Sequence, residues 1–350
     1  MIYDTGSDWL VLDTDFCRNC HDPVYDTRSS SDYKRVSRSK MYQEYGSASI
    51  EGYNVTDSIS VGGETYLPDF PWFALTKQIG IEENFDGILG FSRQSTDYWW
   101  EHGPLLAEQL TINNQISEET VSFLLASERY NSFCDYGKYD INMVKDSDAD
   151  NIVWVPMPEP EFFWESDRVE SMQIGTKSRY RGQTAEYSYR SYQYPAIYDT
   201  GRSLVYAPAG LGYELMTRLT RGLDRYYDRE SGFMYVSCNQ KRYYEDVYLT
   251  IDGFKFQISV EDYWYQFPAE GRETQDTCIL GFLDDDQADY WLLGDVFLRG
   301  YYTIHDNSDH DNAKIGFAPH WVSSKKKVEN TNTVPETKVE DVLYECTPIF

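Results

Sequence analysis

The amino-acid sequence predicts an all-β fold in two domains, and three observations support this prediction. Short runs rich in Val, Ile, Tyr and Phe alternate with Gly and Asp turns along the chain, which is the pattern of β-strands. The length of 350 residues is typical of two domains that each bury a core. A short motif near the N-terminus returns in the second half, which indicates a duplicated unit.

Two β-hairpins are predicted from their turns. Residues 58–61 run into Gly62-Gly63, and residues 247–251 lead through Asp252-Gly253 into residues 254–258. Glycine-containing two-residue turns between such runs are the strongest short-range signal for a hairpin.

Helices are expected only as brief pieces that pack against a sheet. One lies near residues 104–110. The other lies near residues 211–223, where Leu211, Leu215 and Leu219 are four residues apart, the spacing of one helix face.

The pattern of the chain divides it into three parts. An acidic, Pro-containing stretch at residues 146–160 marks the boundary between an N-terminal lobe, residues 1–150, and a C-terminal lobe, residues 151–321. Residues 322–350 are polar, and we expect a disordered tail there. Residues 179–194 are dense in Tyr and Arg, which favours a mobile surface hairpin, with a binding surface as the alternative.

The charge excludes some classes of function. Asp and Glu total 58 against 31 Lys and Arg, for a formal charge of −27. Such a surface repels nucleic acid and anionic membranes, so we expect no nucleic-acid partner. We interpret the excess of acidic residues as an aid to solubility. The alternative is that the protein works at low pH. The sequence contains no run of about 18 apolar residues, so it predicts no membrane span.

The repeated motif carries the chemistry. Residues 2–7 read Ile-Tyr-Asp-Thr-Gly-Ser, and residues 197–203 read Ile-Tyr-Asp-Thr-Gly-Arg-Ser. Each copy has a partner with an apolar pair and a glycine, at residues 85–91 and residues 291–297. One Asp-Thr-Gly is weak evidence, whereas two copies with matching partners are strong evidence.

On these residues the chain resembles the pepsin-like aspartic proteases from residue 1 to about residue 321. Residues 291–302 and 314–319 resemble the C-terminal strands of that family most closely. The resemblance implies a two-lobed pepsin-like β fold with short helices, a central active-site cleft and a flap hairpin over it. It also implies a monomeric endopeptidase that cuts peptides or proteins at acid pH, needs no cofactor or metal, and acts in the lysosome or vacuole or after secretion. No signal peptide is visible.

The resemblance identifies Asp4 and Asp199 as the catalytic pair. Two adjacent carboxylates cannot both ionise, so one pKa rises and the other falls, an effect of which aspartic proteases are the type case. The pair would hold a water, with one carboxylate taking its proton and the other donating to the peptide carbonyl. The surrounding active-site loops are Thr5, Gly6, Ser7, Thr200, Gly201, Arg202 and Ser203. The two glycines would let backbone N–H groups approach the carboxylates. The two threonines would hold the two loops together.

A flap is expected at residues 45–49. They read Tyr-Gly-Ser-Ala-Ser and resemble the family's Tyr-Gly-Thr-Gly-Ser, with Ala48 in place of a glycine. By this resemblance Tyr45 and Gly46 cover the substrate and Ser47 bonds its backbone. The alternative is that Tyr45 is an ordinary strand residue.

Three further residues match pocket positions of the family. They are Ile79, Phe85 and Ile88. Their size implies a preference for large apolar substrate residues at the bond that is cut.

Six cysteines are present, at positions 17, 20, 134, 238, 278 and 346. Cys17 and Cys20 suit a redox pair or half of a zinc site, but a zinc site needs more ligands at matching spacing. In the family a small disulfide loop lies there, and Cys238 and Cys278 match another family disulfide.

Other hydrolase classes lack their motifs. The five histidines form no His-Glu-x-x-His, the signature of many zinc proteases, and no Gly-x-Ser-x-Gly elbow occurs.

The serious alternative is a relative that binds peptides without cutting them, and three departures from the family support it. Only three residues precede Asp4, so we expect a truncated N-terminal segment and exposed sheet edges. Val11 stands where the family has a Trp that bonds the flap Tyr, a role that nearby Trp9 would take over. Arg202 stands where the family has Ser or Thr.

Overall fold

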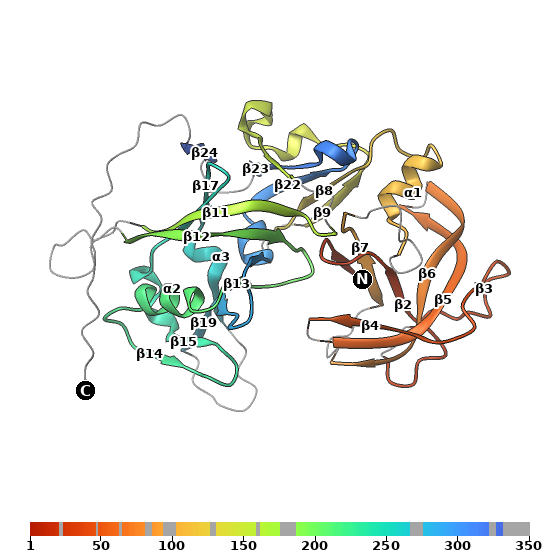
Figure 1. Ribbon diagram of the computed structural model, residues 1–350, viewed down its shortest axis with the longest axis horizontal. Helices are drawn as coiled ribbons and strands as arrows, with labels where there is room; N and C mark the ends of the chain where they lie inside the picture. The colour runs from red at the N-terminus through yellow and green to blue at the C-terminus, as the bar shows by residue number, and fades with distance from the viewer. Residues whose placement is uncertain are drawn as a thin grey trace.

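The computed structural model shows two β lobes side by side, joined by strands that lie between them (Figure 1). The described residues are 1–20, 24–46, 48–62, 65–80, 86–93, 103–126, 131–158, 162–175, 187–266, 276–321 and 327–331. Within these ranges strands predominate, so the all-β prediction is confirmed.

The N-terminal lobe is built on a seven-stranded sheet in the order β1-β7-β2-β6-β5-β3, with β4 paired to β5. Its strands are β1 (Ile2–Asp4), β2 (Leu10–Asp13), β3 (Lys34–Arg35), β4 (Met41–Tyr45), β5 (Ala48–Val61), β6 (Thr65–Ile79) and β7 (Gly87–Gly90). The long β5–β6 hairpin is buried on both faces, because Val55 and Trp72 belong to one hydrophobic cluster and Ile50 and Phe73 belong to another.

The C-terminal lobe contains an eight-stranded and a four-stranded sheet. The larger has the order β20-β13-β21-β12-β11-β16-β17-β24, with β11 (Glu165–Ile174), β12 (Tyr187–Tyr198), β13 (Val205–Ala207), β16 (Val247–Ile251), β17 (Phe254–Ile258), β20 (Phe282–Asp284), β21 (Trp291–Leu293) and β24 (Glu329–Asn330). The smaller has the order β14-β15-β19-β18, with β14 (Arg225–Tyr227), β15 (Met234–Ser237), β18 (Trp264–Gln266) and β19 (Thr277–Leu280).

A five-stranded antiparallel sheet combines strands from both halves of the chain, in the order β10-β23-β22-β8-β9. It consists of β8 (Thr120–Leu124), β9 (Phe133–Tyr136), β10 (Val153–Pro156), β22 (Tyr301–Asp306) and β23 (Lys314–Pro319). In Figure 1 the blue β22 and β23 lie beside the yellow-green β8 and β9, between the lobes. This central sheet fixes one half of the chain against the other.

The helices are short. They are α1 (Leu106–Ile112), α2 (Leu211–Leu219), α3 (Val260–Tyr263) and α4 (Asp295–Leu298), with 3₁₀ turns at Ile141–Met143, Lys145–Ser147, Ala149–Asn151, Cys238–Tyr243 and His310–Asn312. The first two fall where the sequence predicts them, and Leu211, Leu215 and Leu219 are all buried. None of the helices in the described ranges has the length and apolar character needed to cross a membrane.

The sequence repeat corresponds to a repeated strand arrangement. β1 pairs in parallel with β7, and β12 pairs in parallel with β21. The following strand of each half, β2 or β13, then runs antiparallel to the same partner. The two motifs at residues 85–91 and 291–297 therefore supply the strands that support the two Asp-Thr-Gly loops.

Other local predictions can be compared with the described residues. The hairpin at residues 247–258 forms as β16 and β17, and β5 pairs with β6 as far as Val61 and Thr65. Residues 329–330, within the expected disordered tail, instead form β24, because they pair with the edge of β17 and Val328 is buried. Residues 322–326, 332–350 and 179–186 lie outside the described residues, whereas residues 187–194 belong to β12. The domain boundaries stay a prediction.

Candidate active site

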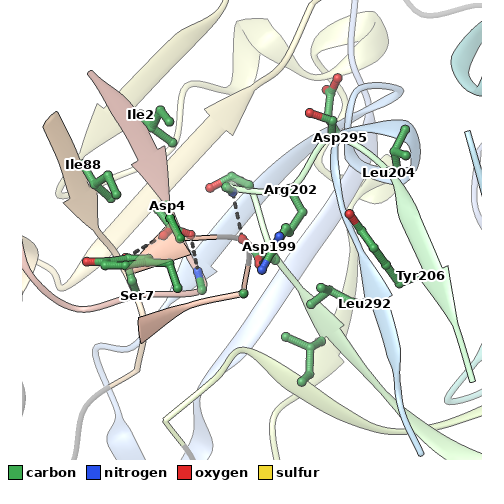
Figure 2. Close-up of a pocket in the computed structure, with 18 of the residues that line it drawn as sticks. Ile2, Asp4, Ser7, Ile88, Asp199, Arg202, Leu204, Tyr206, Leu292 and Asp295 are labelled. Atoms are coloured by element: carbon green, nitrogen blue, oxygen red, sulfur yellow. Dashed lines mark hydrogen bonds and ion pairs between the residues drawn. The ribbon is translucent and has the colours of Figure 1, made fainter. Parts of the chain in front are cut away.

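The two Asp-Thr-Gly loops meet at the floor of the cleft between the lobes. β1 ends at Asp4, and β12 ends one residue before Asp199. Each aspartate side chain is buried, with 7% of its residue exposed. Figure 2 shows the two carboxyl groups next to each other, although they are 195 residues apart in the sequence.

The two threonines hold the loops together through reciprocal hydrogen bonds. The backbone N–H of Thr5 donates to Oγ1 of Thr200 at 3.0 Å, and the N–H of Thr200 donates to Oγ1 of Thr5 at 2.9 Å. The Thr5 hydroxyl donates to the carbonyl of Tyr198 at 2.8 Å, and the Thr200 hydroxyl donates to the carbonyl of Tyr3 at 2.7 Å. Every one of these hydrogen bonds crosses from one lobe to the other, so the hydrogen-bond network fixes the distance between the two carboxyl groups.

The two glycines allow each loop to approach the opposite aspartate. The N–H of Gly6 donates to Oδ1 of Asp4 at 2.9 Å, and the N–H of Gly201 donates to Oδ1 of Asp199 at 2.8 Å. A β-carbon on Gly6 would lie 2.6 Å from Oδ2 of Asp199, and one on Gly201 would overlap Oδ1 of Asp4. Any side chain at either position would push the carboxyls apart.

The symmetry of the loops breaks at the residue after glycine. The Ser7 hydroxyl donates to Oδ2 of Asp4 at 2.6 Å. The equivalent position in the second loop is Arg202, whose Nε lies 3.9 Å from Oδ2 of Asp199, too far for a hydrogen bond. Two donors therefore stabilise negative charge on Asp4, whereas Asp199 receives one.

The environment of Asp199 favours its protonated form. Burial raises the pKa of Asp199 to about 8, with further increases from the negative charge of Asp4 and a hydrogen bond to it. The Gly201 N–H and the charge of Arg202 lower this pKa, but by less. The pair is thus suited to carry one proton, on Asp199.

The cleft around this pair has a volume of about 1320 Å³. That is larger than the ~300–1,000 Å³ typical of small-molecule pockets, and it suits an extended peptide. Its walls combine the flap with apolar and aromatic side chains of both lobes, among them Ile2, Ile88, Leu125, Phe162, Phe163, Leu204, Tyr206, Phe233 and Leu292.

The expected flap is the hairpin of β4 and β5, which ends at the pair Tyr45–Ala48. Gly46 and Tyr45 both line the cleft. Burial raises the pKa of Tyr45, and the charges of Asp4 and Asp8 add to this effect. Ser47 lies outside the described residues.

Trp9 does not take over the bond to the flap tyrosine. Its indole Nε1 is buried and has no hydrogen-bond partner within the part of the chain that the structure describes. The ring packs against Phe73 and leaves no room for a side chain on Gly103. Val11 is buried in β2, so the indole that the family offers there is absent.

The three expected pocket residues are placed differently. Ile88 lines the cleft. Ile79 ends β6 with 58% of its residue exposed and is not among the residues that line the cleft, although its neighbour Gly80 is. Phe85 lies outside the described residues.

Several lining residues were missed from the sequence. Leu292 belongs to the second partner motif, so the repeat itself could have indicated it by analogy with Ile88. Tyr206 and Phe233 gave no comparable signal. Ser203 lines the cleft as expected, and its carbonyl accepts a hydrogen bond from the N–H of Val296 at 3.1 Å.

Both expected disulfides are present. Cys17 is bonded to Cys20, and Cys238 is bonded to Cys278. Cys134 is the free cysteine of the described ranges. Nowhere in these ranges do three or more His, Cys, Asp or Glu side chains gather closely enough to hold a metal ion.

Comparisons with known proteins agree with this geometry. The model of the eukaryotic aspartyl protease family matches residues 1–320. A vacuolar aspartic protease of Candida albicans is 29% identical over 334 residues, which cover 91% of this chain and 71% of the relative. Pepsin A of Gallus gallus is 26% identical, covering 91% and 80%. Plasmepsin VII of Plasmodium falciparum (isolate NF54) is 26% identical, covering 94% and 76%.

Proposed function

The chain belongs to the eukaryotic aspartyl protease family and is an aspartic-type endopeptidase, and from this premise we propose how it works. Asp4 and Asp199 form one catalytic pair that activates a water against the peptide bond. The single observation that supports this most is the hydrogen-bond network between Thr5 and Thr200, which holds two buried carboxyl groups from different lobes together.

The unequal surroundings of the pair suggest a role for each carboxyl. Asp4 accepts from Gly6 and from Ser7 and would be the ionised base that takes the proton of the water. Asp199, with its raised pKa, would donate its proton to the carbonyl oxygen. The water attacks directly, so no covalent intermediate forms.

The proposed mechanism sets the pH range. It requires Asp199 protonated and Asp4 ionised, so activity falls as pH rises through the pKa of Asp199. We propose that the enzyme works on the acid side of that limit.

The proposed substrates are peptides or proteins with large apolar residues at the bond that is cut. Ile88 and Leu292 lie at equivalent places on β7 and β21, and both line the cleft. The flap of β4 and β5 would cover the bound peptide through Tyr45 and Gly46.

We propose that the protein is a monomer of the lysosome or vacuole, or is secreted. The two disulfides suit an oxidising compartment. The name of the Candida albicans relative, a vacuolar aspartic protease, points the same way.

The test is cleavage of a denatured protein from about pH 2 to 7, with and without pepstatin, a transition-state analogue. We expect acid cleavage that pepstatin blocks. Pepstatin binding without cleavage at any pH would instead support the alternative, a pepsin-fold protein that binds peptides. The structural reason to consider this alternative is that Arg202 lies beside Asp199.

A further inference from the structure

Arg202 lies between the catalytic pair and the flap. Its Nε is 3.9 Å from Oδ2 of Asp199, and its guanidinium carbon is 5.9 Å from the centre of the Tyr206 ring. A β-carbon on Gly46, in the flap, would overlap Nη2 of Arg202. The guanidinium therefore occupies the space that a side chain at position 46 of the flap would take. Figure 2 shows Arg202 beside Asp199, on the side of Tyr206.

Among the described residues, no side-chain or backbone group accepts a hydrogen bond from this guanidinium. Throughout the described residues it makes the ion pair with Asp199 and the ring contact with Tyr206, but no side-chain hydrogen bond. An arginine presents five N–H donors in a fork that fits a carboxylate with two parallel bonds. Asp199 does not use that fork, because 3.9 Å exceeds the 2.7–2.9 Å of a charge-assisted bond.

Arg202 is also the only cationic side chain among the described residues that line the cleft. Two of the acidic side chains there have other partners. Asp295 is paired with Arg299, and Asp8 accepts a hydrogen bond from the N–H of Gly103 at 2.5 Å. With 26% of its side chain exposed, Arg202 is accessible to a ligand in the cleft.

We propose that Arg202 is a specificity-determining residue, which binds an acidic side chain of the peptide substrate within about two residues of the bond that is cut. The bond must lie over Asp4 and Asp199, and side chains of an extended peptide alternate between its two sides every 3.8 Å or less along the chain. A Glu or Asp that points toward the wall of Tyr206 then reaches the free fork. This inference rests on the proposed function and adds a substrate class to it.

The competing attraction comes from Glu44, an exposed carboxylate of the flap that also lines the cleft. It would favour basic substrates. Exposed charges interact weakly across solvent, whereas a two-bonded guanidinium–carboxylate pair in a half-buried site is stronger. We therefore expect the acidic preference to win.

The experiment uses a set of peptides that differ at one position at a time near the cut bond, carrying Gln, Glu, Lys or cysteic acid. For the wild type at pH 6 we expect kcat/KM to be about 10-fold higher for Glu than for Gln at one position. At pH 3 the Glu preference should vanish, because a Glu carboxyl is protonated below about pH 4.3. The permanently charged sulfonate of cysteic acid should keep its preference at both pH values.

The variants assign this preference to one side chain. In Arg202→Thr the Glu-to-Gln ratio should fall to about 1, whatever the absolute rate, and Arg202→Lys should keep part of it because Lys retains the charge without the fork. Arg221→Thr, the same change at an exposed site of that lobe outside the cleft, should keep the full ratio.

A preference for Lys, or a Glu preference that survives Arg202→Thr, would overturn the inference. If the wild type cleaves no peptide at all, the proposed function fails. The affinities of non-cleavable Glu and Gln peptides for wild type and Arg202→Thr, measured by calorimetry, then decide the role of Arg202 separately.

Discussion

A β-carbon on Gly6 would lie 2.6 Å from Oδ2 of Asp199, the carboxyl of the opposite lobe. Real β-carbons do not approach an oxygen so closely, so Gly6→Ala must displace a carboxyl whose position decides the chemistry. A misplacement of about 1 Å can lower a rate 10²-fold. We expect kcat of Gly6→Ala to fall by about that factor, with a smaller change in KM, in steady-state assays of a peptide substrate.

The control for this variant is Gly175→Ala. A β-carbon on Gly175 would have its nearest neighbour at 3.4 Å, an ordinary contact. Its kinetics should match the wild type, and an unchanged kcat in Gly6→Ala would contradict the proposed packing of the pair.

Asp199→Asn should remove nearly all activity while leaving the protein folded. Asn keeps the shape of the side chain and can donate an N–H, but it has no acidic proton to transfer. General acid catalysis contributes about 10²- to 10⁴-fold, so we expect a loss of kcat in that range, measured with the fold checked by circular dichroism. Cleavage close to the wild-type rate would exclude Asp199 from the pair.

His305 should make the protein less stable in acid. It lies in β22 of the central sheet, 1% exposed, against the rings of Phe123 and Trp164. Burial lowers the pKa of His305 to about 3. Between this value and the ordinary ~6.5, the unfolded chain binds a proton that the folded chain does not. The stability that neutral His305 allows is thus present above about pH 6.5 and is lost as pH falls toward 3.

The matched variant is His305→Phe, which keeps an aromatic ring and cannot be protonated. At pH 4 the histidine disfavours the folded state by an amount on the order of 3 kcal/mol relative to pH 7. The gain in unfolding free energy from His305→Phe, measured in urea, should therefore be larger at pH 4 than at pH 7. An equal gain at both pH values would show that His305 does not titrate in this way.

The two disulfides should stabilise the fold unequally. Cys238 and Cys278 are 40 residues apart, and Cys17 and Cys20 only 3. In the loop-entropy model the longer closure contributes about 4 kcal/mol and the shorter about 2 kcal/mol. Urea unfolding of the two paired Cys→Ser variants should show that order, with Cys134→Ser as the control that removes no bridge. A larger loss from the shorter loop would contradict it.

Much of the fold and the centre of the site could be predicted because they depend on local signals and on a repeat. The Asp252-Gly253 turn specifies its hairpin locally. Asp4 and Asp199 were found together because the same short motif surrounds both, and the structure gives both the same strand support.

What could not be predicted depends on packing between distant segments. The position of the Arg202 guanidinium depends on Gly46, more than 150 residues away in the sequence, so no local pattern predicts it. The burial of His305 depends on Trp164 and Phe123 meeting at one sheet. Trp9 was expected to bond Tyr45 because it is close to Val11 in the sequence, but its ring packs against Phe73 and its indole N–H has no partner among the described residues.

The central sheet has a consequence for a nicked form of the enzyme. A cut in the turns at Lys145–Ser147 or Ala149–Asn151 would leave β8 and β9 on one fragment and β10, β22 and β23 on the other. β8 would still be hydrogen-bonded to β22 across the break. The two fragments would remain associated as a non-covalent heterodimer, each contributing one aspartate, and neither would be a complete enzyme alone.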